Sequence, residues 1–261
     1  MGADGVVALA FSAAGIGVLA EAALRSDVGD SEPAARCRSS AAARCVGAEH
    51  AASLRANGYF VIDGAVSARA CAAAAADAAR VHALRGSPAA FAAERGDDVC
   101  WIRAAGDGEA PLARDTVACV DAVRGVAAAL QAAGYETAVD FLVPAQCQLA
   151  RYDAGKRGYA RHLDRCDETL SDLGLLGWLR ASDYRRRALT CILYLNDMEG
   201  QGGELRLYLG GPDAETPRVD VAPRAGRLLV FESGRLEHEV LAARAPRFAL
   251  TNWVATGWSC P

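Results

Sequence analysis

The two histidines in the second half of the chain each lie beside carboxylates with which they could share a metal ion. His162 and Asp164 are two positions apart, and on a β-strand side chains at that spacing point to the same face. His238 lies in a second strand-like stretch, between Glu237 and Glu239. Two imidazoles and one carboxylate on one side of an iron(II) ion leave its other coordination positions open. The pattern therefore predicts a mononuclear metal site formed by His162, Asp164 and His238.

Each part of this pattern also has an ordinary explanation when it stands alone. An isolated His-x-Asp pair is common in proteins that bind no metal, and a single histidine such as His238 is often simply half-exposed. The other two histidines, His50 and His82, fall in alanine-rich helical stretches, so we expect them on the surface. The metal hypothesis therefore depends on the combination of all three residues.

An arginine after the last of these histidines adds an anion-binding group. Arg247 follows His238 by nine residues and begins the last apolar stretch. If the two stretches form adjacent antiparallel strands joined by a short turn, both residues lie at one mouth of a barrel. The rigid guanidinium fork pairs with a carboxylate in bidentate geometry and suits a dicarboxylate ligand. A surface arginine in an arginine-rich chain is the ordinary alternative.

The elements that would carry these residues change in character along the chain. Helices are predicted over 48–57, 67–84 and 113–132, with a strand at 59–62. Short runs rich in Val, Leu, Ile, Tyr and Thr follow, and we expect strands at 141–143, 146–152, 189–195, 204–208, 227–231, 237–241 and 248–254. Helices followed by strands indicate an α+β fold with helices packed outside a β-sandwich or barrel.

Composition restricts the class of protein. The chain has 261 residues, a net charge of −4 and 52% hydrophobic residues, which is ample for a folded core. The slightly acidic balance argues against a nucleic-acid partner, because phosphate binding needs a basic surface. The nine cysteines are widely spaced and include no Cys-x-x-Cys pair, which argues against a zinc ribbon. We expect reduced thiols in an intracellular protein of the cytoplasm or nucleus.

Residues 1–47 differ from the rest of the chain. Residues 5–24 are apolar but consist mostly of Ala, Gly and Val, and Glu21 interrupts them, so they make a poor signal sequence or membrane anchor. Residues 25–45 have the composition of a linker or a transit-type segment. We expect 1–47 to be disordered or to serve in targeting, and 48–261 to form one domain with its catalytic core at about 145–257.

The second half of the chain resembles the prolyl 4-hydroxylase branch of the 2-oxoglutarate- and Fe(II)-dependent dioxygenases, in particular the hypoxia-inducible-factor prolyl hydroxylases. The matching segments are 152–155, 158–164, 190–196, 202–206, 227–231, 238–240 and 247–251. Trp101 and Ile102 fit the family's N-terminal support region more loosely.

The resemblance implies a double-stranded β-helix, or jelly roll, with supporting N-terminal helices. It implies that Fe(II) is bound by His162, Asp164 and His238. The far carboxylate of 2-oxoglutarate would pair with Arg247 and the Tyr194 hydroxyl. The other positions that the resemblance assigns to this pocket are Tyr152, Thr251, Ile192, Leu205 and Val240, and those near a prolyl substrate are Tyr159, Arg187 and Trp253.

The implied reaction is 4-hydroxylation of a peptidyl proline by O₂ and 2-oxoglutarate, with release of succinate and CO₂. The resemblance also implies ascorbate as a helper that re-reduces the iron, and oxygen sensing as a role. We expect a proline in an extended segment of an intracellular protein as substrate, and no membrane span. The alternatives are the same chemistry on a Pro-rich secreted or cell-wall chain, oxidation of a small molecule, and a non-catalytic binding relative.

One segment departs from the hypoxia-type enzymes. The stretch between Asp164 and Arg187 is longer than the short connection that the resemblance implies. Its apolar residues could pack a short helix at about 170–179 or form a lid beside the substrate entrance. We favour the packed helix.

Overall fold

The computed structural model describes residues 31–37, 45–85, 87–88, 94–103, 112–135, 137, 140–165, 182–210 and 217–257. Within these ranges the helices are η1 (Ala34–Arg36, a 3-10 turn), α2 (Ala48–Asn57), α3 (Ala68–Arg85), α4 (Arg114–Arg124), α5 (Val126–Ala132) and α7 (Ser182–Arg186). The strands are β1 (Ser31–Pro33), β2 (Tyr59–Ile62), β3 (Ser87–Pro88), β4 (Asp97–Arg103), β5 (Phe141–Pro144), β6 (Gln146–Tyr152), β7 (Tyr159–His162), β8 (Arg187–Tyr194), β9 (Leu205–Tyr208), β10 (Arg218–Val221), β11 (Leu228–Glu232), β12 (His238–Val240) and β13 (Arg247–Thr256).

The strands form a large and a small antiparallel sheet. The large sheet has the order β2-β11-β8-β13-β6-β4-β3, and β5 joins it through β13 and pairs in turn with β1. The small sheet has the order β10-β9-β12-β7. Neighbouring strands come mostly from distant parts of the chain, as where β8 lies between β11 and β13. Two antiparallel sheets connected in this way form a jelly roll.

The central strands of the large sheet are buried on both faces. On β8, Cys191 and Leu193 point into the core shared with the helices, whereas Ile192 and Tyr194 point the other way and pack with Leu207 of the small sheet. This alternation follows from the two-residue period of a strand. It divides the side chains of the large sheet into a helix-facing set and a set that faces the space between the sheets.

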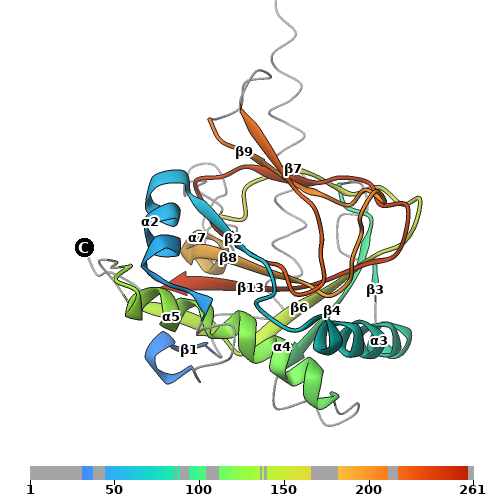
Figure 1. The fold of residues 1–261 in the computed structure, drawn as a ribbon, viewed down its shortest axis with the longest axis horizontal. Coiled ribbons are helices and arrows are strands. Elements are labelled where there is room, and N and C mark those ends of the chain that lie inside the picture. Colours follow the sequence, from blue (N-terminus) through green and yellow to red (C-terminus); the bar gives the residue numbers. More distant parts are fainter. Residues whose placement is uncertain are drawn as a thin grey trace, which may run out of the picture.

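The helices lie on the outer face of the large sheet. α4 packs against α3 and against strands β8 and β13, and α2 packs against β2 and β11. Figure 1 shows α3, α4 and α5 on the opposite side of the large sheet from β7 and β9. The molecule therefore has three layers, and the inward-facing side chains between the two sheets are screened from water on both sides.

Several predicted elements have the predicted bounds. α2 ends at Gly58, whose backbone has a φ of 80° and donates to the Leu54 carbonyl, as expected for a glycine that ends a helix. The strands at 59–62 and 146–152 are confirmed as β2 and β6. The predicted strands from 189 to 254 correspond to β8, β9, β11, β12 and β13, shifted by one or two residues at their ends.

Other predictions about the elements were wrong. The helix predicted over 113–132 is two helices, α4 and α5, which meet at Gly125, because glycine is a poor residue for a helix interior. Strands β1, β3, β4, β7 and β10 were not among the predicted strands. The short helix predicted at 170–179 lies outside the described residues.

The first 47 residues also contain ordered structure where they are described. β1 pairs with β5, Glu32 pairs with Arg124, and Ala34 and Val46 are buried in the main core. These contacts join residues 31–37 and Val46 to the core of the domain that the sequence predicts for 48–261.

Two further features bear on the sequence predictions. The seven cysteines within the described ranges are all free thiols. Among the helices in those ranges, none combines the length and the hydropathy of a membrane span.

Candidate active site

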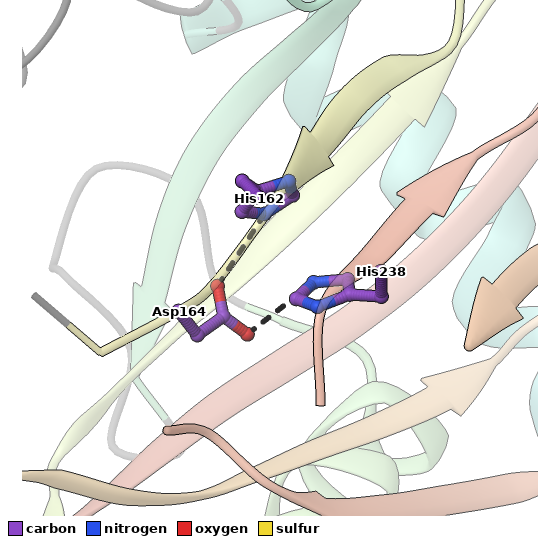
Figure 2. A group of neighbouring side chains, drawn as sticks. All are labelled: His162, Asp164 and His238. Carbon is purple, nitrogen blue, oxygen red and sulfur yellow. Dashed lines mark ion pairs between the residues drawn. The ribbon is translucent and has the colours of Figure 1, made fainter. Parts of the chain in front are cut away.

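The three predicted metal-ligand residues lie together between the sheets. His162 and His238 are directly opposite each other in the paired strands β7 and β12, and Asp164 lies just beyond the end of β7. The carboxylate is 3.6 Å from the Nε2 atom of each imidazole, and Figure 2 shows all three side chains converging on one point. The three ligand atoms are within 4.8 Å of one another. They are therefore placed where one ion could contact all three.

The hydrogen bonds of the two imidazoles select the nitrogen that can bind a metal. His162 Nδ1 is 2.7 Å from the Ala160 carbonyl oxygen, and His238 Nδ1 is 3.3 Å from that of Leu236. A carbonyl oxygen can only accept, so both Nδ1 atoms must carry the proton. The Nε2 atoms, which face Asp164, then keep their lone pairs.

The electrostatic state of the cluster also suits a cation. Burial lowers the pKa of His238 to about 4, so this imidazole is neutral near pH 7. Burial alone would raise the pKa of Asp164, but His238, His162 and Arg187 outweigh it and hold the pKa well below its usual range. A neutral imidazole at His238 and an ionised carboxylate at Asp164 are protonation states that a divalent ion requires of its ligands.

Aromatic rings hold the two imidazoles in place. Tyr159 stacks on His162 with 3.8 Å between ring centroids, and Phe231 meets His238 edge-on at 4.7 Å. Burial raises the pKa of Tyr159 to about 12, so its hydroxyl stays protonated. The residue predicted near the prolyl substrate, Tyr159, is thus in direct contact with the metal cluster.

An unpaired cation lies further along the space between the sheets. Arg247 is 2% exposed, and its guanidinium lies 5.0 Å from the ring centroids of both Tyr152 and Tyr194. Its Nε donates to the Gly203 carbonyl at 3.0 Å, and no carboxylate in the described part of the chain pairs with it. The buried Tyr194 hydroxyl has no hydrogen-bond partner there either. A buried charge and a buried hydroxyl without partners are costly, so this is a site for an anionic ligand.

Apolar side chains connect the metal cluster to Arg247. Thr190, Ile192 and Tyr194 alternate along β8 and face the small sheet, and Thr251 of β13 is paired with Ile192. Leu205 and Val240, also predicted for the co-substrate pocket, are buried and paired with each other in the small sheet. All seven residues predicted for the co-substrate lie in the two strand layers that enclose this space: Arg247, Tyr194, Tyr152, Thr251, Ile192, Leu205 and Val240.

The prediction about how Arg247 reaches the site was wrong. His238 and Arg247 do not belong to one hairpin, since β12 is in the small sheet and β13 is in the large sheet. The connection between them crosses from one sheet to the other. His238 and Arg247 therefore come from opposite sheets of the sandwich and not from one barrel mouth formed by a hairpin.

The other two predicted substrate residues form an aromatic cluster with a cation. The Arg187 guanidinium lies 4.2 Å from the ring of Trp253 and 4.1 Å from that of Tyr184. Trp101, on β4 of the same sheet, has its ring 6.0 Å from that of Trp253. Tyr184 was not predicted, because it lies in a segment whose sequence gave no strand or helix pattern.

Two hydroxyl residues beside the metal cluster were also missed. Thr190 donates to Asp164 at 2.6 Å and lies 2.9 Å from the Ser233 hydroxyl. The strand alternation that places Ile192 in the site also places Thr190 there, so this signal was available in the sequence. Nothing in the sequence marks Ser233.

Comparison with known proteins gives a family match over the strands that carry the site. Residues 147–255 match the 2OG-Fe(II) oxygenase superfamily. The chain is 33% identical over 112 residues to Egl nine homolog 1 of Rattus norvegicus, which is 41% of this chain and 28% of the relative. It is 44% identical over 71 residues to the hypoxia-inducible factor prolyl hydroxylase of Caenorhabditis elegans, which is 26% of this chain and 9% of the relative.

A solved structure extends the likeness over most of the chain. The prolyl-4-hydroxylase of Pseudomonas putida superimposes with a TM-score of 0.61 at 30% sequence identity. The match covers 81% of this chain and 99% of that one. The chain thus spans nearly all of the bacterial protein but less than a third of the rat relative's length.

Proposed function

The chain belongs to the 2OG-Fe(II) oxygenase superfamily, and from this membership we propose that it hydroxylates a proline within a peptide segment. The carrying observation is the pairing of two features in one buried space. His162, Asp164 and His238 converge at one end, and the unpaired guanidinium of Arg247 lies at the other. Relatives named as prolyl hydroxylases match the chain, one of them over 81% of its length.

In this proposal, the Nε2 atoms of His162 and His238 and one carboxylate oxygen of Asp164 would hold Fe(II). Two histidines and one carboxylate are the ligand set of non-haem iron(II) oxygenases. When bound, iron(II) and 2-oxoglutarate together supply the O₂ activation that a side chain cannot. The protein contributes the two imidazoles, the single negative charge of Asp164, and the burial of Asp164 and His238.

Arg247 and Tyr194 orient the co-substrate. The guanidinium pairs with the carboxylate of 2-oxoglutarate that is remote from the metal. Burial raises the pKa of Tyr194, so its hydroxyl is a donor at any physiological pH, and it supplies a hydrogen bond to the same carboxylate. The apolar side chains of Ile192, Leu205 and Val240 keep water away from the reacting groups.

The proposed substrate residues lie at the metal end of this space. Tyr159 stacks on His162, and Arg187 and Trp253 form the adjacent cation–aromatic cluster. A proline ring packs well against aromatic side chains, and an extended peptide can supply backbone carbonyls to an arginine. We therefore propose a proline in an extended segment as the substrate, and oxygen sensing as a role that depends on the identity of that segment.

The overall reaction is balanced by O₂ as oxidant. One oxygen atom enters a C–H bond of the proline ring as a hydroxyl group. The other enters succinate as 2-oxoglutarate loses CO₂. Ascorbate is proposed as a reductant that restores iron(II), and the location of the protein inside the cell is proposed on its free thiols.

The proposal is tested with the purified full chain, Fe(II), ascorbate, 2-oxoglutarate and a library of proline-containing peptides. We expect succinate release that depends on peptide, and a mass gain of one oxygen atom on a proline. Asp164→Ala should abolish both, because it removes the anionic ligand. Succinate release with no oxidised proline in any peptide would reject the proline assignment and leave a small-molecule oxygenase.

A further inference from the structure

We propose that Thr190 and Ser233 are positioning residues that present Asp164 to the metal through a single carboxylate oxygen. The inference rests on the proposed function, because it assumes that Asp164 is a ligand. It concerns two residues to which the resemblance described above assigned no role, although Thr190 lies in one of the matching segments. Its consequence is measured by metal binding and does not require turnover.

The geometry is a chain of three buried polar groups. The Thr190 hydroxyl is 2.6 Å from Asp164 Oδ2, and the Ser233 hydroxyl is 2.9 Å from the Thr190 hydroxyl. Thr190 is 1% exposed and Ser233 is 0% exposed. Hydrogen bonds closed off from water in this way are strong and costly to break.

The direction of the protons follows from the chemistry of the groups. Under the proposed function Asp164 binds the metal as a carboxylate, so both of its oxygens can only accept. Thr190 has one hydroxyl proton and must donate it to Asp164. In its contact with the Ser233 hydroxyl, the Thr190 oxygen can then only accept, so Ser233 donates to Thr190.

The Thr190 hydrogen bond distinguishes the two oxygens of Asp164, since each of them lies 3.6 Å from one histidine Nε2. Oδ2 accepts the Thr190 proton, whereas Oδ1 accepts no hydrogen bond that involves only the described residues. Oδ1 is therefore the oxygen free to bind the ion. A carboxylate with one oxygen held by a hydroxyl does not readily rotate to bind through both, so a coordination position stays open for other ligands.

The same contacts tie the two sheets together at the metal. Thr190 is on β8 and is paired with Phe231 of β11, and Ser233 follows β11 directly. The Ser233 backbone is fixed in turn, because its N–H donates to the Ala188 carbonyl and its own carbonyl accepts from Arg165. The large sheet thus sets the orientation of Asp164, which follows strand β7 of the small sheet.

The experiment compares metal binding by the full chain and three variants, with Co²⁺ as an oxygen-insensitive probe followed by visible absorption and calorimetry. Thr190→Val keeps the shape of the side chain and removes the hydroxyl. We expect it to weaken Co²⁺ binding about 10- to 100-fold and to alter the cobalt absorption bands. Thr190→Ser restores the hydroxyl and should bind within about threefold of the unmodified chain.

Thr116→Val is the matched control. Thr116 is a buried threonine that donates to Asp77 Oδ2 at 2.8 Å, between helices α4 and α3. Its replacement removes the same kind of hydrogen bond away from the metal cluster. We expect Thr116→Val to lower thermal stability and to leave Co²⁺ affinity and the cobalt bands unchanged.

Equal Co²⁺ affinity and equal bands in Thr190→Val and the unmodified chain would overturn the inference. If Thr190→Val does not fold, Ser233→Ala decides, since a few-fold loss of affinity supports the relay and an unchanged affinity rejects it. The proposed function fails by a different result, which is Co²⁺ binding by the unmodified chain without hydroxylation of any proline. Failure of the unmodified chain to bind Co²⁺ at all would reject both.

Discussion

At the scale of single residues, Tyr194 and Arg247 are a pair of neighbouring buried polar side chains. A buried hydroxyl without a partner gives up its hydrogen bonds to water and gains nothing in return. A buried guanidinium without a carboxylate partner loses the hydration of its charge, and no ion pair compensates for that loss. Such groups are retained where a ligand completes them, and the two predictions that follow separate their contributions.

Tyr194→Phe removes only the unpartnered hydroxyl. We expect the melting temperature of the ligand-free variant to equal or exceed that of the unmodified chain, because no hydrogen bond within the protein is lost. In contrast, the stabilisation produced by added 2-oxoglutarate should fall, with binding about 5- to 10-fold weaker. Differential scanning fluorimetry with and without 2-oxoglutarate measures both effects. A large loss of stability without ligand would show that the hydroxyl has a structural partner.

Arg247→Ala removes the charge that pairs with the remote carboxylate. The KM for 2-oxoglutarate should rise at least about 30-fold, since breaking a buried charge pair costs about 2 kcal/mol or more. Arg247→Lys should restore only part of the affinity, because an ammonium lacks the bidentate fork. Arg227→Ala is the control, since Arg227 pairs with the exposed Asp63. An unchanged 2-oxoglutarate requirement in Arg247→Ala would remove this residue from the site.

At the scale of elements, α3 contains a histidine whose position contradicts the sequence prediction. His82 was expected on the surface, but it is 6% exposed, and its ring faces Phe248 of β13 at 6.5 Å. Neither ring nitrogen has a hydrogen-bond partner among the described residues. Burial lowers the pKa of His82, and the nearby Arg151 lowers it further. The alanine-rich sequence around His82 does not show which face of α3 is buried, because that face is set by the elements that pack against the helix.

This burial predicts a pH dependence of stability. Because the folded pKa of His82 lies below that of an unfolded histidine, near about 6.5, the unfolded chain binds a proton first as the pH falls. The free energy of unfolding should therefore decrease below about pH 6.5. In His82→Leu this decrease should be smaller, and the part that remains comes from His238, whose pKa is also lowered. Urea unfolding of the metal-free proteins at about pH 7.5 and 5.5 measures this decrease in the free energy of unfolding. An equal decrease in His82→Leu and in the unmodified chain would contradict the assignment to His82.

At the scale of the whole molecule, the site depends on two sheets held face to face and on helices that close the outer side of the large sheet. In the metal cluster, His162 and His238 are on strands of the small sheet and Asp164 follows β7. Arg247, Tyr194 and Thr190 are on strands of the large sheet. The N-terminal residues 31–37 add to the far edge, where β1 pairs with β5. They therefore contribute to the stability of the domain and not to the site.

Two truncations test this division. We compare a chain that starts at residue 31 with one that starts at residue 45. The shorter chain loses the β1–β5 pairing, the Glu32–Arg124 ion pair and the buried Ala34. We expect it to be less stable by about 1–3 kcal/mol, or roughly 3–10 °C in melting temperature, with unchanged affinity for Co²⁺. Equal melting temperatures would place the domain boundary after residue 44.

The sequence by itself determined the residue types and spacings of the candidate site. His162, Asp164, His238 and Arg247 were selected because their chemistry is specific and few other residues could substitute for them. The central strands and α2 were also predictable, since they depend on local alternation and on a helix-ending glycine. These signals are read over a few neighbouring residues.

The tertiary structure alone decided how those residues meet. It placed β12 and β13 in opposite sheets, divided a predicted helix at Gly125, buried His82, and brought Thr190 and Ser233 to Asp164. Each of these outcomes depends on contacts between segments that are distant in the chain. Local propensity carries no information about such contacts, because pairing and burial are properties of the packed molecule and not of any one segment.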